Sequence, residues 1–140
     1  MDNLISTDVI TATLVPDAKR LDFLPSLFGT RLMMRVEGLV YDWMGRLCPD
    51  YCGGYWEFYR LSNGTGYLVP RRAGSVRIAV GGNGFSSSMS AGAAGIVATL
   101  FALCDLAAQV RDDAVIDLFH GLRDFAAEHA KMALIFAAID

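Results

Sequence analysis

Three residue types in this chain could together form a nucleophilic catalytic site. Cys48 supplies a thiol, His120 a general base, and Asp117 a carboxylate that could orient the histidine. A reactive thiol of this kind needs a strained turn or a setting that lowers its pKa, and the sequence around Cys48 predicts neither. We therefore do not expect an enzyme, and a small hydrolase that uses Cys48 or an acid stays open as an alternative.

The cysteines and histidines do not have the spacing of a metal site. Three residues separate Cys48 from Cys52, Cys104 stands alone, and His120 and His129 lie far along the chain. A structural zinc ion needs about four such ligands close together. We predict structural thiols and no metal or other cofactor. The odd number of cysteines and the lack of a signal peptide favour the reducing cytoplasm.

Aromatic residues concentrate in one predicted hairpin and could form a contact surface. In the strand expected over residues 55–61, Trp56 and Phe58 should face one way and Tyr55 and Tyr59 the other, because side chains alternate along a strand. The outer tyrosines, Tyr55 and Tyr59, are candidate contacts for a protein partner. Aromatic side chains on a sheet also stack on nucleic-acid bases, so a nucleic-acid-binding regulator is the alternative function.

Acidic residues gather in the last third of the chain. Asp113, Asp117 and Asp124 stand at helical spacing and predict a modest negative stripe. Asp140 ends the final helix, where the macrodipole disfavours an acid by about 0.3–1 kcal/mol. These four acids are further candidate partner contacts, although a solvated helix face and a frayed helix end are the simpler explanations.

The net charge argues against two kinds of nucleic-acid chemistry. Fifteen acids against twelve bases leave a formal charge of −3 over 140 residues. A DNA duplex carries roughly one negative charge per 1.7 Å, so whole-surface mimicry of DNA is not expected. No clustered basic face predicts strong direct binding to DNA either.

The elements that must position these residues begin with an arm and two helical segments. Residues 1–18 lack helical periodicity and are expected to form an extended or mobile arm, followed by a single domain over 19–140. Residues 21–28 suit a short helix or turn that ends at Gly29. Thr30 is a plausible N-cap for a helix that runs to about Cys48.

The middle of the chain predicts antiparallel strands. Runs suited to strands cover residues 55–61, 67–69 and 76–80, with a short fourth strand over 85–89. The segment 62–66 contains Asn-Gly, a strong hairpin signal. We expect an antiparallel meander of three to four strands.

Three helices should complete an α+β fold. Residues 91–108 are apolar enough to resemble a membrane span, but Asp105 inside the run would cost about 2.5 kcal/mol or more in lipid. A buried central helix capped by Ser90 is the better interpretation, and no membrane contact is expected. A second helix should start at Asp112 or Asp113, and a third should run from about Lys131 to Ile139.

Several long segments of the chain resemble the ArdB/KlcA antirestriction proteins. They are RLDFLPSLFG at 20–29, CPDYCGGYWEFYRLSNG at 48–64, MSAGAAGI at 89–96, LRDFAAEHA at 122–130 and IFAAID at 135–140. The similarity covers nearly everything after the arm. Cys52 and Gly92 depart from the family pattern, in which position 52 is usually polar and position 92 usually acidic.

The resemblance implies a function in relieving restriction. Proteins of this family are encoded on mobile elements and protect incoming plasmid or phage DNA from type I restriction, and they bring no catalytic residues. With a charge too small for DNA mimicry, we expect the chain to act as a cytoplasmic monomer by protein contact. The expected partner is the type I restriction-modification complex or an accessory host protein.

Overall fold

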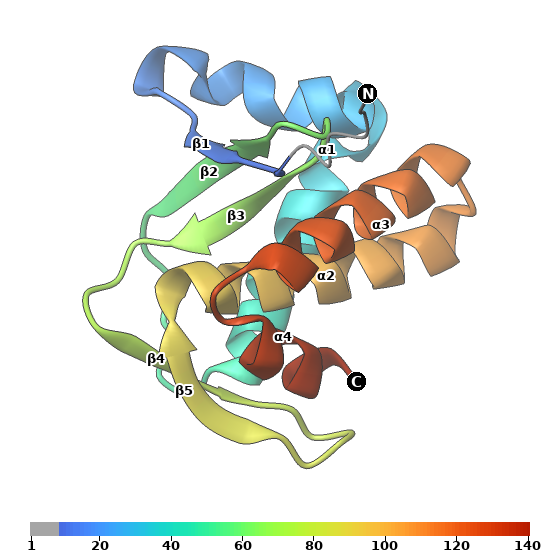
Figure 1. Cartoon of the computed structure of the whole chain (residues 1–140). Coiled ribbons are helices and arrows are strands. Elements are labelled where there is room, and N and C mark those ends of the chain that lie inside the picture. Colours follow the sequence, from blue (N-terminus) through green and yellow to red (C-terminus); the bar gives the residue numbers. More distant parts are fainter. Residues whose placement is uncertain (1–8) are drawn as a thin grey trace, which may run out of the picture.

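Five short strands and four α-helices account for most of residues 9–140, the part of the chain that this computed structural model describes (Figure 1). In chain order they are β1 (Ala12–Leu14), the 3-10 turn η2 (Asp17–Lys19), α1 (Arg20–Leu47), β2 (Trp56–Leu61), β3 (Gly66–Pro70), β4 (Ser75–Ala79), β5 (Ser86–Ser90), α2 (Ala91–Val110), α3 (Asp113–Glu128) and α4 (Met132–Ile139). This order of helix, antiparallel strands and three C-terminal helices confirms the predicted α+β class.

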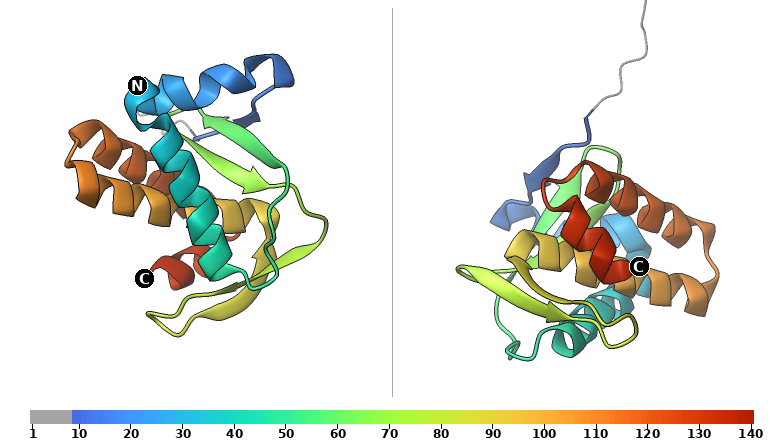
Figure 2. Two further views of the ribbon diagram at one scale, coloured as in Figure 1. Left: turned by 180° about the vertical axis from the view of Figure 1, so that it is seen from behind. Right: turned by 60° about the horizontal axis from the view of Figure 1, so that its bottom comes forward.

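Helix α1 is bent into two limbs at Gly29. The backbone there has φ 71° and ψ 165°, a conformation outside the helical region that glycine adopts without a steric penalty. One limb covers residues 20–28, and the second resumes at Thr30, so the two predicted helical segments are both present. Figure 2 shows the limbs meeting at a sharp angle when the molecule is seen from behind.

The strands form two sheets, whereas a single meander was expected. β1, β2 and β3 make one antiparallel sheet in that order, and β4 and β5 make another. The additional strand β1 comes from the segment predicted as an arm. It pairs with β2 in the register Ala12↔Leu61 to Leu14↔Tyr59. Residues 1–8 of that segment lie outside the described residues.

Helix α2 occupies the edge of β3 where a fourth strand of the first sheet would pair. The Leu68 N–H donates to Thr99 Oγ1 at 3.3 Å, and that hydroxyl donates to the Gly95 carbonyl at 2.7 Å. A Cβ on Gly95 would collide with the Leu68 carbonyl oxygen and approach Val69 Cα to 2.9 Å. Glycine therefore permits the contact that covers this edge, and β4 pairs elsewhere.

Helix α2 is the central element of the core. It lies between α1 and α3 (Figures 1 and 2), and 61% of its most apolar 18-residue window is buried inside the fold, which confirms the predicted buried helix. Asp105, the acid within this apolar run, accepts a hydrogen bond from Trp43 Nε1 at 2.8 Å. The Trp43 ring also stacks on Phe101 at 4.5 Å between centroids. These contacts hold the second limb of α1 against α2.

The C-terminal helices begin where their capping residues predict. Ser90 Oγ accepts from the Ala93 N–H at the start of α2, and Asp112 Oδ1 accepts from the Ala114 N–H at the start of α3.

The turn between β4 and β5 contacts the last helix. The Asn83 side-chain amide in this turn donates to the Ala138 carbonyl at 2.9 Å. The hairpin is thereby tied to the last turn of α4.

Candidate interaction surfaces

An apolar groove lies in the angle between the two limbs of α1. It has a volume of about 370 Å³. The lining residues are Arg20, Leu21, Leu24, Pro25, Met33, Met34, Glu37 and Phe58. Leu21 and Met34, which come from different limbs, are 92% and 74% exposed. Large apolar side chains exposed beside a groove mark a surface suited to a protein partner.

Tyr55 stands beside this groove between two arginines. The guanidinium of Arg20 lies 4.5 Å from the centre of the Tyr55 ring, and that of Arg71 lies 4.3 Å from it. Arg20 also lies 4.3 Å from the Phe58 ring centre, and Arg71 pairs with Glu57 at 3.0 Å. Cation–π contacts of this kind fix flexible side chains in place.

Tyr59 lies on the face of β2 opposite Phe58, as the strand alternation predicts. Tyr55 precedes β2 and shares Arg20 with Phe58, so the expectation that Tyr55 and Tyr59 face the same way is wrong. The Tyr59 ring stacks on Tyr67 at 5.3 Å, and Tyr67 stacks in turn on Phe125 of α3 at 5.7 Å. Burial, reinforced by the neighbouring Tyr59, raises the pKa of Tyr67 to about 12. Because Trp56 and Phe58 are also buried, the hairpin offers few free ring faces on which a base could stack.

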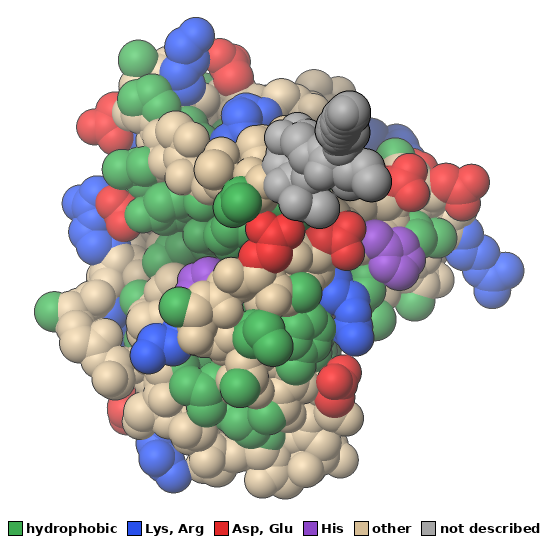
Figure 3. Space-filling view, viewed as in Figure 1, with side chains coloured by type: hydrophobic (Ala, Val, Ile, Leu, Met, Phe, Trp, Pro, Cys, Tyr) green, Lys and Arg blue, Asp and Glu red, His purple; other side chains and the backbone are tan. Residues whose placement is uncertain are grey.

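Asp113, Asp117 and Asp124 are exposed on α3, where the sequence predicts a negative stripe. His120 stands between Asp117 and Asp124 in the helix, and Figure 3 shows acidic side chains scattered among apolar, basic and uncharged ones on the face in view. Asp140 is separate from the α3 aspartates in sequence, and its carboxylate lies 4.0 Å from the guanidinium of Arg123. Both partners of that pair are largely exposed, so the interaction contributes little to stability.

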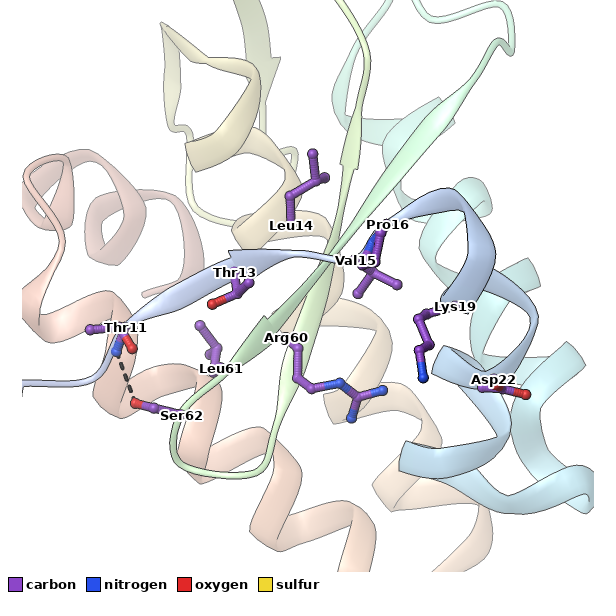
Figure 4. A pocket seen from close by; sticks show the side chains of 10 residues that line it. All are labelled: Thr11, Thr13, Leu14, Val15, Pro16, Lys19, Asp22, Arg60, Leu61 and Ser62. Atoms are coloured by element: carbon purple, nitrogen blue, oxygen red, sulfur yellow. Dashed lines mark hydrogen bonds between the residues drawn. The ribbon is translucent and has the colours of Figure 1, made fainter.

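A larger pocket of about 540 Å³ opens beside β1 (Figure 4). The side chains of Arg60 and Lys19 point toward one another in it, and Leu14 points away. Arg60 donates to Ser26 Oγ at 3.0 Å. Asp22 also lines the pocket, so its charged side chains are two cations and one acid.

The residues considered for catalysis do not share a site. Cys48 is buried at the C-terminal end of α1, whereas His120 and Asp117 are exposed on α3. Cys52 and Cys104 are exposed free thiols. Within residues 9–140, no group of three or more His, Cys, Asp or Glu side chains is arranged to hold a metal ion.

Comparisons with known proteins give the family. A model of the antirestriction protein family matches residues 49–140. Two Escherichia coli proteins named antirestriction protein KlcA are similar to this chain. The first is 56% identical over 94% of this chain and 95% of its own length. The second is 54% identical over 94% of both chains. The chain belongs to the antirestriction protein family.

A solved structure extends this antirestriction relationship to the whole fold. It is 55% identical, covers 100% of both chains and has a TM-score of 0.89. That work describes KlcA and ArdB as having a novel fold and antirestriction activity against type I DNA restriction systems in vivo but not in vitro. The resemblance found in the sequence is confirmed. Antirestriction proteins are not a known family of enzymes.

The six candidate contact residues of this antirestriction protein do not form one patch. Tyr55 lies beside the α1 groove, Tyr59 lies on the sheet face toward α3, and the α3 acids and Asp140 lie among the C-terminal helices. Sequence reasoning missed the groove and its exposed residues, Leu21 and Met34. Met34 lies off the buried stripe of its limb, and the bend at Gly29 brings it to the same groove as Leu21.

Proposed function

We propose that this chain relieves the restriction of incoming plasmid or phage DNA by host type I systems, through contact with a protein. In this proposal the chain catalyses no reaction, needs no cofactor and does not imitate DNA. Its membership of the antirestriction family supports the biological role. The distribution of charge supports the mode of action.

The spacing of acids on α3 is the observation that carries the argument against mimicry. Asp113 and Asp124 are about 16 Å apart along a helix that rises about 1.5 Å per residue. A DNA duplex of that length carries about nine phosphate charges. Over the same stretch α3 has three aspartates, with His120 and Arg123 among them. This density is too low to compete with a duplex for a DNA-binding channel.

The proposed partner is the type I restriction-modification complex or an accessory host protein. KlcA and ArdB are described as active in vivo but not in vitro, which favours a component that purified reactions lack. We propose that the chain acts as a cytoplasmic monomer. Tyr55, Tyr59, Asp113, Asp117, Asp124 and Asp140 remain its candidate contact residues, with the exposed acids at the rim of the interface, where charges contribute little to binding.

Phage plating tests the proposed function. Expression of the chain in a restricting host should raise the plating of unmodified phage, and phage progeny should still carry the host modification. Purification of the tagged chain from that host should retain a restriction subunit or one accessory protein. Plating that stays at the restricted level while soluble chain is present would contradict the proposal.

A further inference from the structure

The α1 groove is held open by the backbone. Its walls come from two helical limbs whose relative direction is set at Gly29, and its floor includes Phe58 of β2. The second limb is fixed to the core through Trp43 and Asp105. Leu21 and Met34 remain exposed on the two walls, and no described part of the chain covers them.

Arg20 on the edge of this groove is available for a carboxylate. Its guanidinium carbon lies 4.5 Å from the centre of the Tyr55 ring and 4.3 Å from that of the Phe58 ring, and a guanidinium held over ring faces can still donate to a carboxylate. Among residues 9–140, no carboxylate lies within 4.0 Å of it.

The acids nearest to the groove already have partners. Glu37 accepts from the Tyr41 hydroxyl at 3.0 Å, and Glu57 is paired with Arg71 at 3.0 Å. Glu37 on the groove wall keeps its negative charge, but neither acid forms an ion pair with Arg20 within residues 9–140, so Arg20 can pair with an acidic group from outside the chain. The groove joins an apolar surface to a prepared site for one negative charge.

We propose that this groove docks an amphipathic helix of the partner protein through which restriction is relieved. The helix places an apolar side chain between Leu21 and Met34 and a carboxylate, about one turn away, against Arg20. Methionine side chains suit this role because they adapt to the shape of an incoming group. Arginine, tyrosine and methionine are also enriched where interfaces bind most strongly. The inference rests on the proposed antirestriction function and adds the surface and the chemistry of its partner.

The first test compares two methionine substitutions in a restricting host. Met34→Glu puts a charge in the groove at an exposed position, and Met132→Glu makes the same change at a 47% exposed position on α4. Loss of an anchoring contact should lower the relief of restriction about tenfold or more for Met34→Glu, and less than about twofold for Met132→Glu. Thermal unfolding of both purified variants should match the wild-type protein.

The outcomes separate the two proposals. If wild-type protein relieves restriction and folded Met34→Glu relieves it equally, the docking proposal is overturned and the proposed function stands. If wild-type protein gives no relief, the proposed function fails, and the docking proposal fails with it.

A second test identifies the occupant. A photoreactive phenylalanine analogue at position 34, in cells of the restricting host, should form an adduct with a restriction subunit or one accessory protein. Peptide mapping should place an Asp or Glu within about one helical turn of the linked residue. An adduct with nucleic acid, with lipid or with a second copy of this chain would overturn the proposal.

Discussion

The two sides of this molecule differ in charge and in the surfaces they present. Residues 9–90, which build the kinked helix and both sheets, carry nine bases against six acids. Residues 91–140, which build the three C-terminal helices, carry three bases against seven acids. The first side has an apolar groove with an oriented arginine. The second has a solvated acidic helix face.

This difference indicates how such a small protein can act without imitating DNA. A mimic must be acidic over the whole surface that faces a DNA-binding channel, whereas here the excess of acids is confined to one side. The opposite side has what a protein partner needs, namely exposed apolar residues and arginines held by ring stacking. Helix α2 belongs to the second side and also packs against α1 and β3 of the first, so it joins the two into one body.

Substitution of Gly95 should destabilise the packing of α2 against β3, which joins the two sides. We expect this loss of stability to be the largest effect. Gly95→Ala forces a Cβ into the backbone of β3, which should cost about 3 kcal/mol and lower the Tm by roughly 10 °C. Gly92→Ala, in the same helix with no atom within 4 Å of the new Cβ, is the matched control. It should leave stability unchanged or raise it by up to about 1 kcal/mol. Equal melting temperatures for the two variants would contradict the described contact of α2 with β3.

Removal of the Trp43 hydrogen bond should loosen the groove side from α2. Trp43→Phe keeps a ring to stack on Phe101 but leaves the Asp105 carboxylate without its donor. We expect a loss of about 1–2 kcal/mol in the free energy of unfolding, measured by urea denaturation. Asp42→Asn, at an exposed position beside it, should change stability by less than about 0.5 kcal/mol. A Trp43→Phe variant as stable as wild type would show that this hydrogen bond does not tie α1 to the core.

Tyr55 offers a sharper test of the groove side, because it affects function more than stability. Tyr55→Ala removes the ring that orients Arg20 and Arg71, and the two exposed contacts should contribute about 1 kcal/mol or less to stability. Relief of restriction should fall about threefold, which corresponds to less than about 1 kcal/mol of binding. Tyr55→Phe keeps the ring and should behave as wild type in both assays. Loss of relief in the phenylalanine variant would mean that the hydroxyl, and not the ring, makes the contact.

The smallest expected effect is the pH response of the acidic side. Burial, together with repulsion from Lys131, lowers the pKa of His129 below its ordinary value of 6.5, and the neutral Nδ1 accepts from the Lys131 N–H at 2.9 Å. This stabilisation is complete above pH 6.5 and is lost as the pH falls through the lowered pKa. Between about pH 7.5 and about pH 5, the wild-type protein should lose up to about 1 kcal/mol more stability than His129→Asn, as measured by urea denaturation. Parallel pH profiles would show that His129 does not contribute.

Much of the fold could be predicted because its signals are local. The Asn63-Gly64 turn, the caps at Ser90 and Asp112, and the apolar spacing of the helices each depend on a few neighbouring residues. Strand β1 could not be predicted in this way, since three residues pair with a partner about fifty positions away. Nor does any local signal show that α2 covers the edge of β3 and divides the strands into two sheets.

The candidate surfaces were harder to predict than the fold. Periodicity placed Asp113, Asp117 and Asp124 correctly on an exposed helix face. It also separates Met34 from the buried stripe, because Met34 is two positions from Leu32 and therefore lies on the opposite side of the helix. It could not show that the bend at Gly29 brings Met34 and Leu21 to one groove. Arg20 likewise became a candidate only through its distance to Tyr55 and Phe58.

Neutralisation of the acidic side is the most direct test of action by protein contact. The variant with Asp113→Asn, Asp117→Asn and Asp124→Asn together should be expressed in a restricting host and scored by plating of unmodified phage. Because exposed charges at the rim of an interface contribute little, the account predicts relief within about threefold of wild type. Plating at the fully restricted level, with the triple variant folded and present at normal abundance, would contradict the account and favour an electrostatic imitation of DNA.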